Sequence, residues 1–183
     1  SNAAAVLMGL NQHYGSPFSD RELMAIALKV GADVPFFLFG HVAVARGIGD
    51  DLEAYDNLPP FCVVLVCPKL EVSTAWVYRN LDLGLTNRDK DFKIRLFNKD
   101  FSSVKGFLFN DLEQVTIGKF PEIKTVKKTL LDVGAEAALM SGSGPSVFGL
   151  FKDTRQAKKA IRSMTRLGRG GSWKTFLVEL LLP

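Results

Sequence analysis

The run Phe61–Cys67, with the sequence FCVVLVC, is the feature that most limits how this chain can fold. It is continuously apolar, rich in β-branched valine, and directly follows Leu58-Pro59-Pro60. A strand with one face in water would alternate apolar and polar residues, so this run predicts a strand buried on both faces. Such a strand must lie inside a sheet that other layers cover.

The residues after this run predict further strands and helices in mixed order. A helix is expected to begin at Ser73-Thr74, and the other predicted elements are helices at Asn110–Val115, Glu122–Val133 and Thr154–Leu167 and strands at Glu136–Met140, Ser146–Phe151 and Trp173–Leu182. Residues 84–105 are polar and mixed, which predicts irregular structure. Because neighbouring strands are expected to be antiparallel, the fold class that we predict is an α+β sandwich.

The residues before Leu58 predict a second, smaller domain. Helical spacing of apolar residues predicts a helix from Ala4 to about His13, and a capping-box signal at Ser19 begins another that ends near Gly31. The alternation in His41–Arg46 predicts a strand. The acidic stretch that ends in Leu58-Pro59-Pro60 is the best junction, so we expect one domain at 1–57 and another at 58–183.

Composition excludes several classes of protein. Hydrophobic residues make up 47% of the 183 residues, enough for a core, and no apolar run approaches the ~20 residues that cross a bilayer. With no cleavable signal pattern at the start, we expect a soluble cytoplasmic protein. Cys62 and Cys67 are five residues apart and therefore point to opposite faces of a strand. With only two histidines besides, we expect neither a disulfide nor a protein metal site.

The net charge of +4 is concentrated in the predicted helix that begins at Thr154. Its basic residues recur at helical spacing opposite an apolar stripe: Arg155, Lys158, Lys159, Arg162 and Arg166, followed by Arg169. Two interpretations stay open, a solvated helix face or a surface for an anionic partner such as nucleic acid. Aromatic residues are not interleaved with the basic ones as in single-strand binding surfaces, so we expect no nucleic-acid partner.

Asp33 is the only carboxylate in the stretch VGADVPFFLFG, residues 30–40, which is otherwise small or apolar. Two explanations compete for it. Asp33 could accept backbone N–H bonds at the start of a short helix, with Pro35 in the first positions. Alternatively, it could be a base in a site that excludes water.

The stretch MSGSGPS, residues 140–146, is the second candidate for chemistry. Two glycines between hydroxyl residues would let backbone N–H groups approach an oxyanion closely. A tight hairpin between two strands uses the same letters, so both interpretations stay open. The stretch matches neither the Walker loop nor the dinucleotide fingerprint.

Three segments together are more specific than either candidate alone. GADVPFFLFGHVAVARGIGDDL, then NDLE at 110–113, then MSGSGPSVFGLF occur in this order. The chain thereby resembles the GHMP kinase superfamily over essentially its whole length. The resemblance implies a remnant of the ribosomal-S5-like amino domain followed by a ferredoxin-like carboxy domain. It also implies transfer of a phosphoryl group from ATP, with Mg²⁺, to the 2-hydroxyl of a cytidine-diphosphate-linked methylerythritol in non-mevalonate isoprenoid synthesis.

The resemblance assigns roles to particular residues. Asp33 matches the catalytic aspartate of the family, and Thr74 and Tyr78 match a threonine and an aromatic residue that hold the cytidine moiety. Tyr78 could equally be a helix residue that covers the core. The residues that match phosphate-contacting positions are Ser1, Asn2, Ser141, Gly142, Ser143 and Gly144.

The chain starts abruptly inside a helical pattern, which predicts the carboxy-terminal portion of such a kinase. Ser1-Asn2-Ala3 is either what a cleaved expression tag leaves behind or the end of the family's glycine-rich ATP loop. We expect the chain to be inactive alone, and apolar area exposed around Ala5, Leu7, Phe36 and Phe39 would favour a homodimer. The alternatives are another small-molecule kinase of the superfamily or a non-catalytic module that binds through the basic helix.

Overall fold

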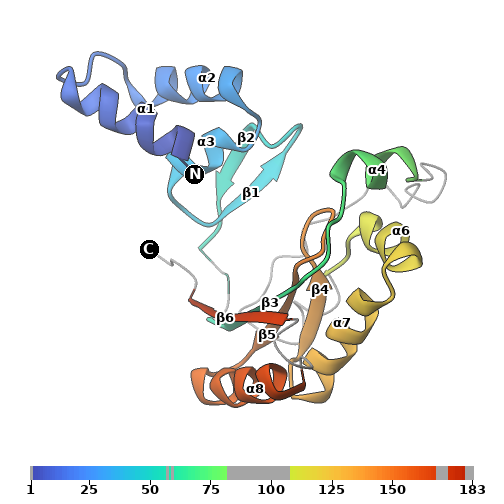
Figure 1. Cartoon of the computed structure of the whole chain (residues 1–183). Coiled ribbons are helices and arrows are strands. Elements are labelled where there is room, and N and C mark those ends of the chain that lie inside the picture. The colour runs from blue at the N-terminus through green and yellow to red at the C-terminus, as the bar shows by residue number, and fades with distance from the viewer. Residues whose placement is uncertain (1, 57, 59, 82–107, 168–172, 180–183) are drawn as a thin grey trace. The chain divides into compact units, whose positions relative to one another are not determined.

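The computed structural model describes residues 2–56, 58, 60–81, 108–167 and 173–179 (Figure 1). The chain divides into two compact units, and the boundary between them falls after Leu58. Among the described residues, no helix is long and apolar enough to cross a membrane. The predicted irregular segment at 84–105 lies outside the described residues.

The described residues of the first unit form three helices and a β-hairpin. Its elements are α1 (Asn2–His13), α2 (Asp20–Val30), α3 (Val34–Phe39), β1 (Ala43–Arg46) and β2 (Asp51–Ala54). The helices meet around Ala4, Ala27 and Val34, small or β-branched side chains that let the backbones approach closely. The first two helices and the first strand were predicted from periodicity, and these predictions are confirmed.

The capping box at the start of α2 is also confirmed. The Ser19 N–H donates to Glu22 Oε2 at 2.9 Å, and the Glu22 N–H donates to Ser19 Oγ at 3.4 Å. Bonds from the Ser19 side chain and then the Ser19 backbone stabilise the carboxylate, so they lower the pKa of Glu22 from its usual 4.5.

Strand β2 was not predicted, because the acidic stretch that contains it was interpreted as a domain junction. It pairs with β1 in antiparallel register, from Ala43 opposite Ala54 to Arg46 opposite Asp51. Three of its four residues are exposed, and Arg46 bonds Glu53 across the strands at 2.8 Å. An exposed hairpin strand needs no apolar alternation, so the pattern that normally reveals a strand is missing.

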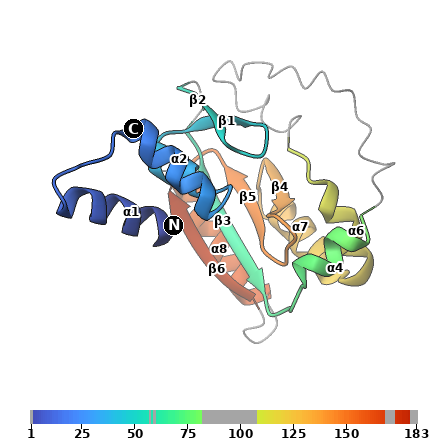
Figure 2. The same ribbon diagram turned by 90° about the horizontal axis from the view of Figure 1, so that it is seen from above.

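The second unit is built on a four-stranded antiparallel sheet. The strands are β3 (Cys62–Pro68), β4 (Ala137–Met140), β5 (Val147–Phe151) and β6 (Trp173–Glu179), in the order β4-β5-β3-β6. Figure 2 shows β3 between β5 and β6. The antiparallel sheet and the separate helices confirm the predicted α+β class.

Helices α7 (Glu122–Asp132) and α8 (Thr154–Leu167) cover one face of this sheet (Figure 1). On that face Val64, Val66 and Pro68 of β3 are buried, while the opposite face of β3 is only partly buried. The prediction of a strand buried on both faces is therefore only half right. Cys62 and Cys67 lie on opposite faces and both are free thiols, as the spacing predicts.

Two shorter helices lie beside each other at the edge of this unit, α4 (Thr74–Arg79) and α6 (Asp111–Lys119) (Figure 2). Side chains of Ser73 and Asn110 cap them. Helix α6 runs four residues beyond the predicted end at Val115. Thr116 is fully buried in it, and this packing outweighs the helix-weakening effect of Gly118.

Candidate functional site

The turn Ser141–Ser146 joins β4 to β5 and is closed by two backbone bonds. The Ser141 N–H donates to the Ser146 carbonyl at 2.8 Å, and the Gly144 N–H donates to the Ser141 carbonyl at 3.0 Å. Gly142 and Gly144 have φ angles of 55° and 84°, in the left-handed region where glycine carries no steric cost. The hairpin interpretation of these letters is therefore confirmed, and it does not exclude contact with an anion.

Helix α6 binds three carbonyl groups at this turn. Asn110 Nδ2 donates to the carbonyls of Met140 and Gly142, both at 2.8 Å. Thr116 Oγ1 donates to the Ser143 carbonyl at 3.2 Å as well as to Leu112 in its own helix. These bonds fix the orientation of the three carbonyl groups relative to α6.

The strand that leads into the turn is anchored by an ion pair. Glu113 Oε2 accepts the Met140 N–H at 2.9 Å, while its other oxygen pairs with Lys127 of α7. Both side chains are largely buried, where a charge-assisted bond is stronger than in water. Helices α6 and α7 thus hold the same end of β4.

Two backbone N–H groups at the turn remain available. In the described part of the chain, neither the Gly142 nor the Ser143 N–H has a hydrogen-bond acceptor. Successive backbone N–H groups in a turn conformation can form a concave arrangement that binds oxyanions. The turn can therefore donate to a phosphate or carboxylate.

The structure brings two of the predicted site residues together at this turn. Thr74 Oγ1 lies 2.8 Å from Ser143 Oγ, although 69 positions separate them in the sequence. Tyr78 lies one helical turn after Thr74, on the same face of α4, and its exposed fraction is 60%. The interpretation of Tyr78 as a core residue is therefore wrong; Val77 takes that role.

Asp33 lies in the other unit, at the residue before α3. Its backbone is helical, with φ −83° and ψ −13°, and its side chain makes no capping bond. The capping interpretation is wrong, because capping side chains reach the helix N–H groups from an extended backbone. Asp33 is exposed, Val34 and Pro35 are buried, and Phe36 and Phe37 are 42% and 48% exposed. Its role as a base stays a prediction.

Other predicted residues are placed as follows. Ser1 lies outside the described residues, and Asn2 is the first residue of α1. Asn110 caps α6 by accepting the Leu112 N–H at 3.0 Å. Sequence reasoning missed the second function of Asn110, its two bonds to the turn, because the NDLE segment carries no sign of partners about 30 positions away.

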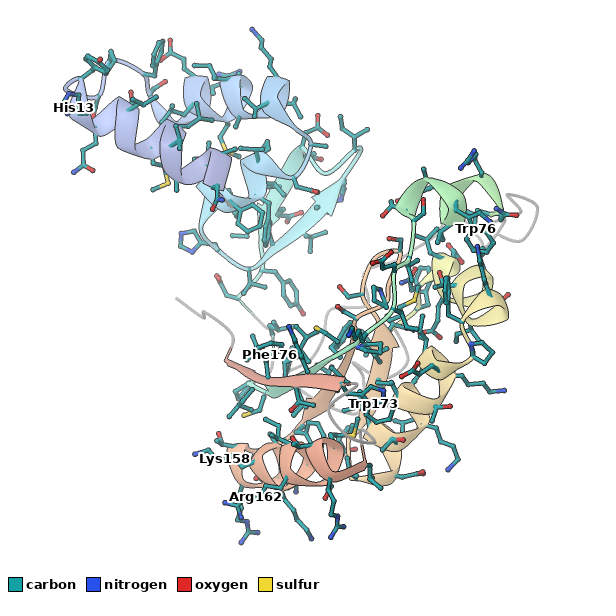
Figure 3. All side chains as sticks on the ribbon, in the orientation of Figure 1. His13, Trp76, Lys158, Arg162, Trp173 and Phe176 are labelled. Atoms are coloured by element: carbon teal, nitrogen blue, oxygen red, sulfur yellow. The ribbon has the colours of Figure 1, made fainter. Side chains whose placement is uncertain are left out.

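The basic face of α8 is exposed. Ala157, Ala160 and Met164 are buried against the sheet, while Figure 3 shows Lys158 and Arg162 pointing away from it. Four basic residues of this face (Arg155, Lys158, Lys159 and Arg162) and Thr154 line a shallow hollow of about 490 Å³. Among the described residues, no ion pair neutralises them, and no group of three or more His, Cys, Asp or Glu could hold a metal ion.

Two models of one protein family match the chain. The model for the GHMP kinase amino-terminal domain matches residues 1–41, and the model for the GHMP kinase carboxy-terminal domain matches residues 94–170. Together they cover most of the chain, in the order expected for that family.

Individual proteins are similar along nearly the whole chain. The 4-diphosphocytidyl-2-C-methyl-D-erythritol kinase of Syntrophotalea carbinolica is 49% identical over 179 residues, which are 98% of this chain and 62% of the relative. The enzyme of that name from Pelobacter propionicus is 48% identical, over 99% of this chain and 63% of its own length. The chain thus spans less than two thirds of these relatives.

Solved structures agree with these similarities. A crystal structure of 4-(cytidine 5'-diphospho)-2C-methyl-D-erythritol kinase matches with a TM-score of 0.75 and 33% identity, covering 97% of this chain and 63% of the other. Homoserine kinase from Cytophaga hutchinsonii matches with a TM-score of 0.70 at 21% identity, over 97% of this chain and 64% of that one, which shows a shared fold alone.

Proposed function

This chain belongs to the GHMP kinase family, and from this premise we propose that it is part of an enzyme that phosphorylates 4-diphosphocytidyl-2-C-methyl-D-erythritol. The observation that carries the proposal is the 49% identity to a kinase of that name over 98% of this chain. The proposed reaction moves the γ-phosphoryl group of ATP, supplied as its Mg²⁺ complex, to the 2-hydroxyl of the substrate. Because the chain spans only 62% of that relative, the proposal concerns the full-length protein.

In this proposal the oxygen of the substrate 2-hydroxyl bonds to the γ-phosphorus of ATP, and the Asp33 carboxylate accepts the proton of that hydroxyl. The bond from that phosphorus to the bridging oxygen breaks, and ADP leaves with the electron pair. A carboxylate on an exposed, helical-type turn can reach a substrate that approaches from solvent, which is compatible with the position of Asp33. Mg²⁺ would enter together with ATP, because it is commonly bound through substrate phosphates and one or two carboxylates.

The second unit supplies the binding groups of the proposal. The free N–H groups of Gly142 and Ser143 would donate to phosphate oxygens, with Ser141 and Gly144 completing the turn. Thr74 and Tyr78 would hold the cytidine end, where the exposed Tyr78 ring offers a face for stacking. Asn2, and Ser1 before it, would contribute to the ATP phosphates from the start of α1.

Two further parts of the proposal concern the setting of the enzyme. A cytoplasmic location suits an ATP-dependent kinase, and the free thiols of Cys62 and Cys67 agree with a reducing compartment. A homodimer is the other, supported by the exposure of Phe36 and Phe37 on the first unit.

The proposal is tested by substituting Asp33→Asn in the full-length protein. Loss of a general base should lower kcat by about 100-fold or more and leave the Kd for ATP nearly unchanged. Asp51→Asn is the matched control, an exposed carboxylate of the same unit, and should leave kcat unchanged. A substrate panel that includes homoserine and mevalonate checks the acceptor; full turnover of the Asp33 variant, or preference for another alcohol, would contradict the proposal.

A further inference from the structure

We propose that Asn110 is a positioning residue that aims the Ser143 N–H group and so sets the anion-binding edge of the turn between β4 and β5. The proposal rests on the proposed function for the nature of the ligand, an oxyanion of the phosphate class. Its geometric content stands on the contacts of α6 with the turn alone.

The direction of the Ser143 N–H follows from the peptide plane. In a planar trans peptide the carbonyl and the N–H point in opposite directions. The Gly142 carbonyl accepts from Asn110 Nδ2 at 2.8 Å, so the N–H of the same peptide, which belongs to Ser143, points away from α6. Asn110 therefore decides where this donor points.

The neighbouring peptide is set from inside the turn. The Ser141 carbonyl accepts the Gly144 N–H at 3.0 Å, so the Gly142 N–H of that peptide points out of the turn. Both N–H groups without an acceptor among the described residues thus face outward, one held by the turn and one by Asn110. A single oxyanion could accept from both.

The Asn110 side chain has one orientation that satisfies all of its bonds. Its Oδ1 accepts the Leu112 N–H at 3.0 Å, while Nδ2 donates to the carbonyls of Met140 and Gly142. A flipped amide would place oxygen against two carbonyl oxygens and lose all three bonds. The same Asn110 side chain therefore caps α6 and orients the peptide between Gly142 and Ser143.

The helix that carries Asn110 is itself held firmly. Thr116 is fully buried, and Glu113 links α6 to α7 through Lys127. The Ser143 hydroxyl is engaged by Thr74 at 2.8 Å, which leaves the Ser143 N–H as the group that meets a ligand. A positioning residue on a rigid support fixes a donor at no cost when the ligand binds.

Two variants of Asn110 separate its role as the cap of α6 from its role in orienting the Ser143 N–H. Asn110→Ser keeps a side-chain oxygen that caps helices well but has no amide donors for the turn. Asn110→Asp also keeps the cap, and it places a carboxylate against the two carbonyls. The matched control is Asp153→Ala, which removes another cap of the same unit, since Asp153 Oδ1 accepts the Gln156 N–H at 2.8 Å in α8.

The experiment uses the ¹⁵N-labelled 183-residue chain in two stages. Residual dipolar couplings without ligand measure the directions of the Gly142 and Ser143 N–H bonds. A titration with inorganic pyrophosphate then measures affinity and the shifts of both amides. We expect both Asn110 variants to change the Ser143 coupling and to weaken pyrophosphate binding at least about tenfold, because one donor to a charged group is lost. Asp153→Ala should change neither.

The two stages have separate consequences. A folded Asn110→Ser chain with the wild-type Ser143 coupling would overturn the positioning role. If the Gly142 and Ser143 amide signals of the wild-type chain did not shift with pyrophosphate, the anion-binding role of the turn in the proposed function would be overturned. The residual dipolar couplings would still decide whether Asn110 orients the Ser143 N–H.

Discussion

Gly144→Ala should destabilise the second unit more than Gly142→Ala, although both glycines lie in the same turn. Both residues have left-handed φ angles, 84° and 55°. An ideal Cβ on Gly144 would lie 2.8 Å from Met140 Sδ and 3.4 Å from Met140 Cγ, whereas a Cβ on Gly142 would have no neighbour within 4 Å. The pair therefore separates backbone strain from crowding.

The magnitudes follow from these two terms. A left-handed non-glycine residue costs about 1–2 kcal/mol, and both variants carry this term. Crowding of a packed core adds about 1–3 kcal/mol, and Met140 is 1% exposed, so its side chain has little room to move away. We expect losses in the free energy of unfolding of about 1–2 kcal/mol for Gly142→Ala and about 2–5 kcal/mol for Gly144→Ala.

Urea unfolding followed by tryptophan fluorescence is the assay. The only two tryptophans of the chain, Trp76 and Trp173, both lie in the second unit, so their emission reports on that unit. With a denaturant slope of about 2 kcal/mol per molar, the Gly144 variant should lower the midpoint by about 1–2.5 M. Met140→Ala in the same chain should relieve the crowding, so that Gly144→Ala then costs only the strain term.

One result would refute this reasoning. If the two glycine variants lost the same free energy within about 0.5 kcal/mol, the contact with Met140 would carry no energetic weight. An unchanged cost of Gly144→Ala in the Met140→Ala chain would point the same way.

Two further predictions concern other parts of the chain. The pKa of Glu22 should lie below 4.5 in an NMR pH series, so its contribution to stability is present above pH 4.5 and is lost as the pH falls through the lower pKa of the folded state. Ser19→Ala should return this pKa toward 4.5. A wild-type Glu22 that titrates at 4.5 or higher would contradict the capping box as the cause. Met164→Ala should lower the free energy of unfolding of the second unit by about 2–5 kcal/mol, because the fully buried side chain leaves a cavity under α8. As a control, Lys159→Ala on the exposed face of α8 should change the free energy of unfolding by less than about 0.5 kcal/mol. Equal losses for Met164→Ala and Lys159→Ala would mean that α8 does not pack as described.

Local patterns were enough to predict most elements of this fold. The boundaries of α8, the capping box of α2, the cap of α6 at Asn110 and the strand β3 all follow from residues within a few positions of one another. Hydrogen bonds and apolar spacing inside one helix or strand act over such short separations, so the sequence displays them directly. The family motifs were readable for the same reason, as short continuous segments.

The site depended on contacts that no local pattern records. Asn110 meets Gly142 across 32 positions and Thr74 meets Ser143 across 69, and both contacts exist only because the sheet brings the β4–β5 turn beside α4 and α6. The exposed strand β2 and the uncapped backbone of Asp33 likewise escaped prediction, since neither is determined by side-chain pattern alone. The sequence by itself determined which residue types are present for the chemistry; the tertiary structure decided which of their donors are satisfied and which remain free to bind.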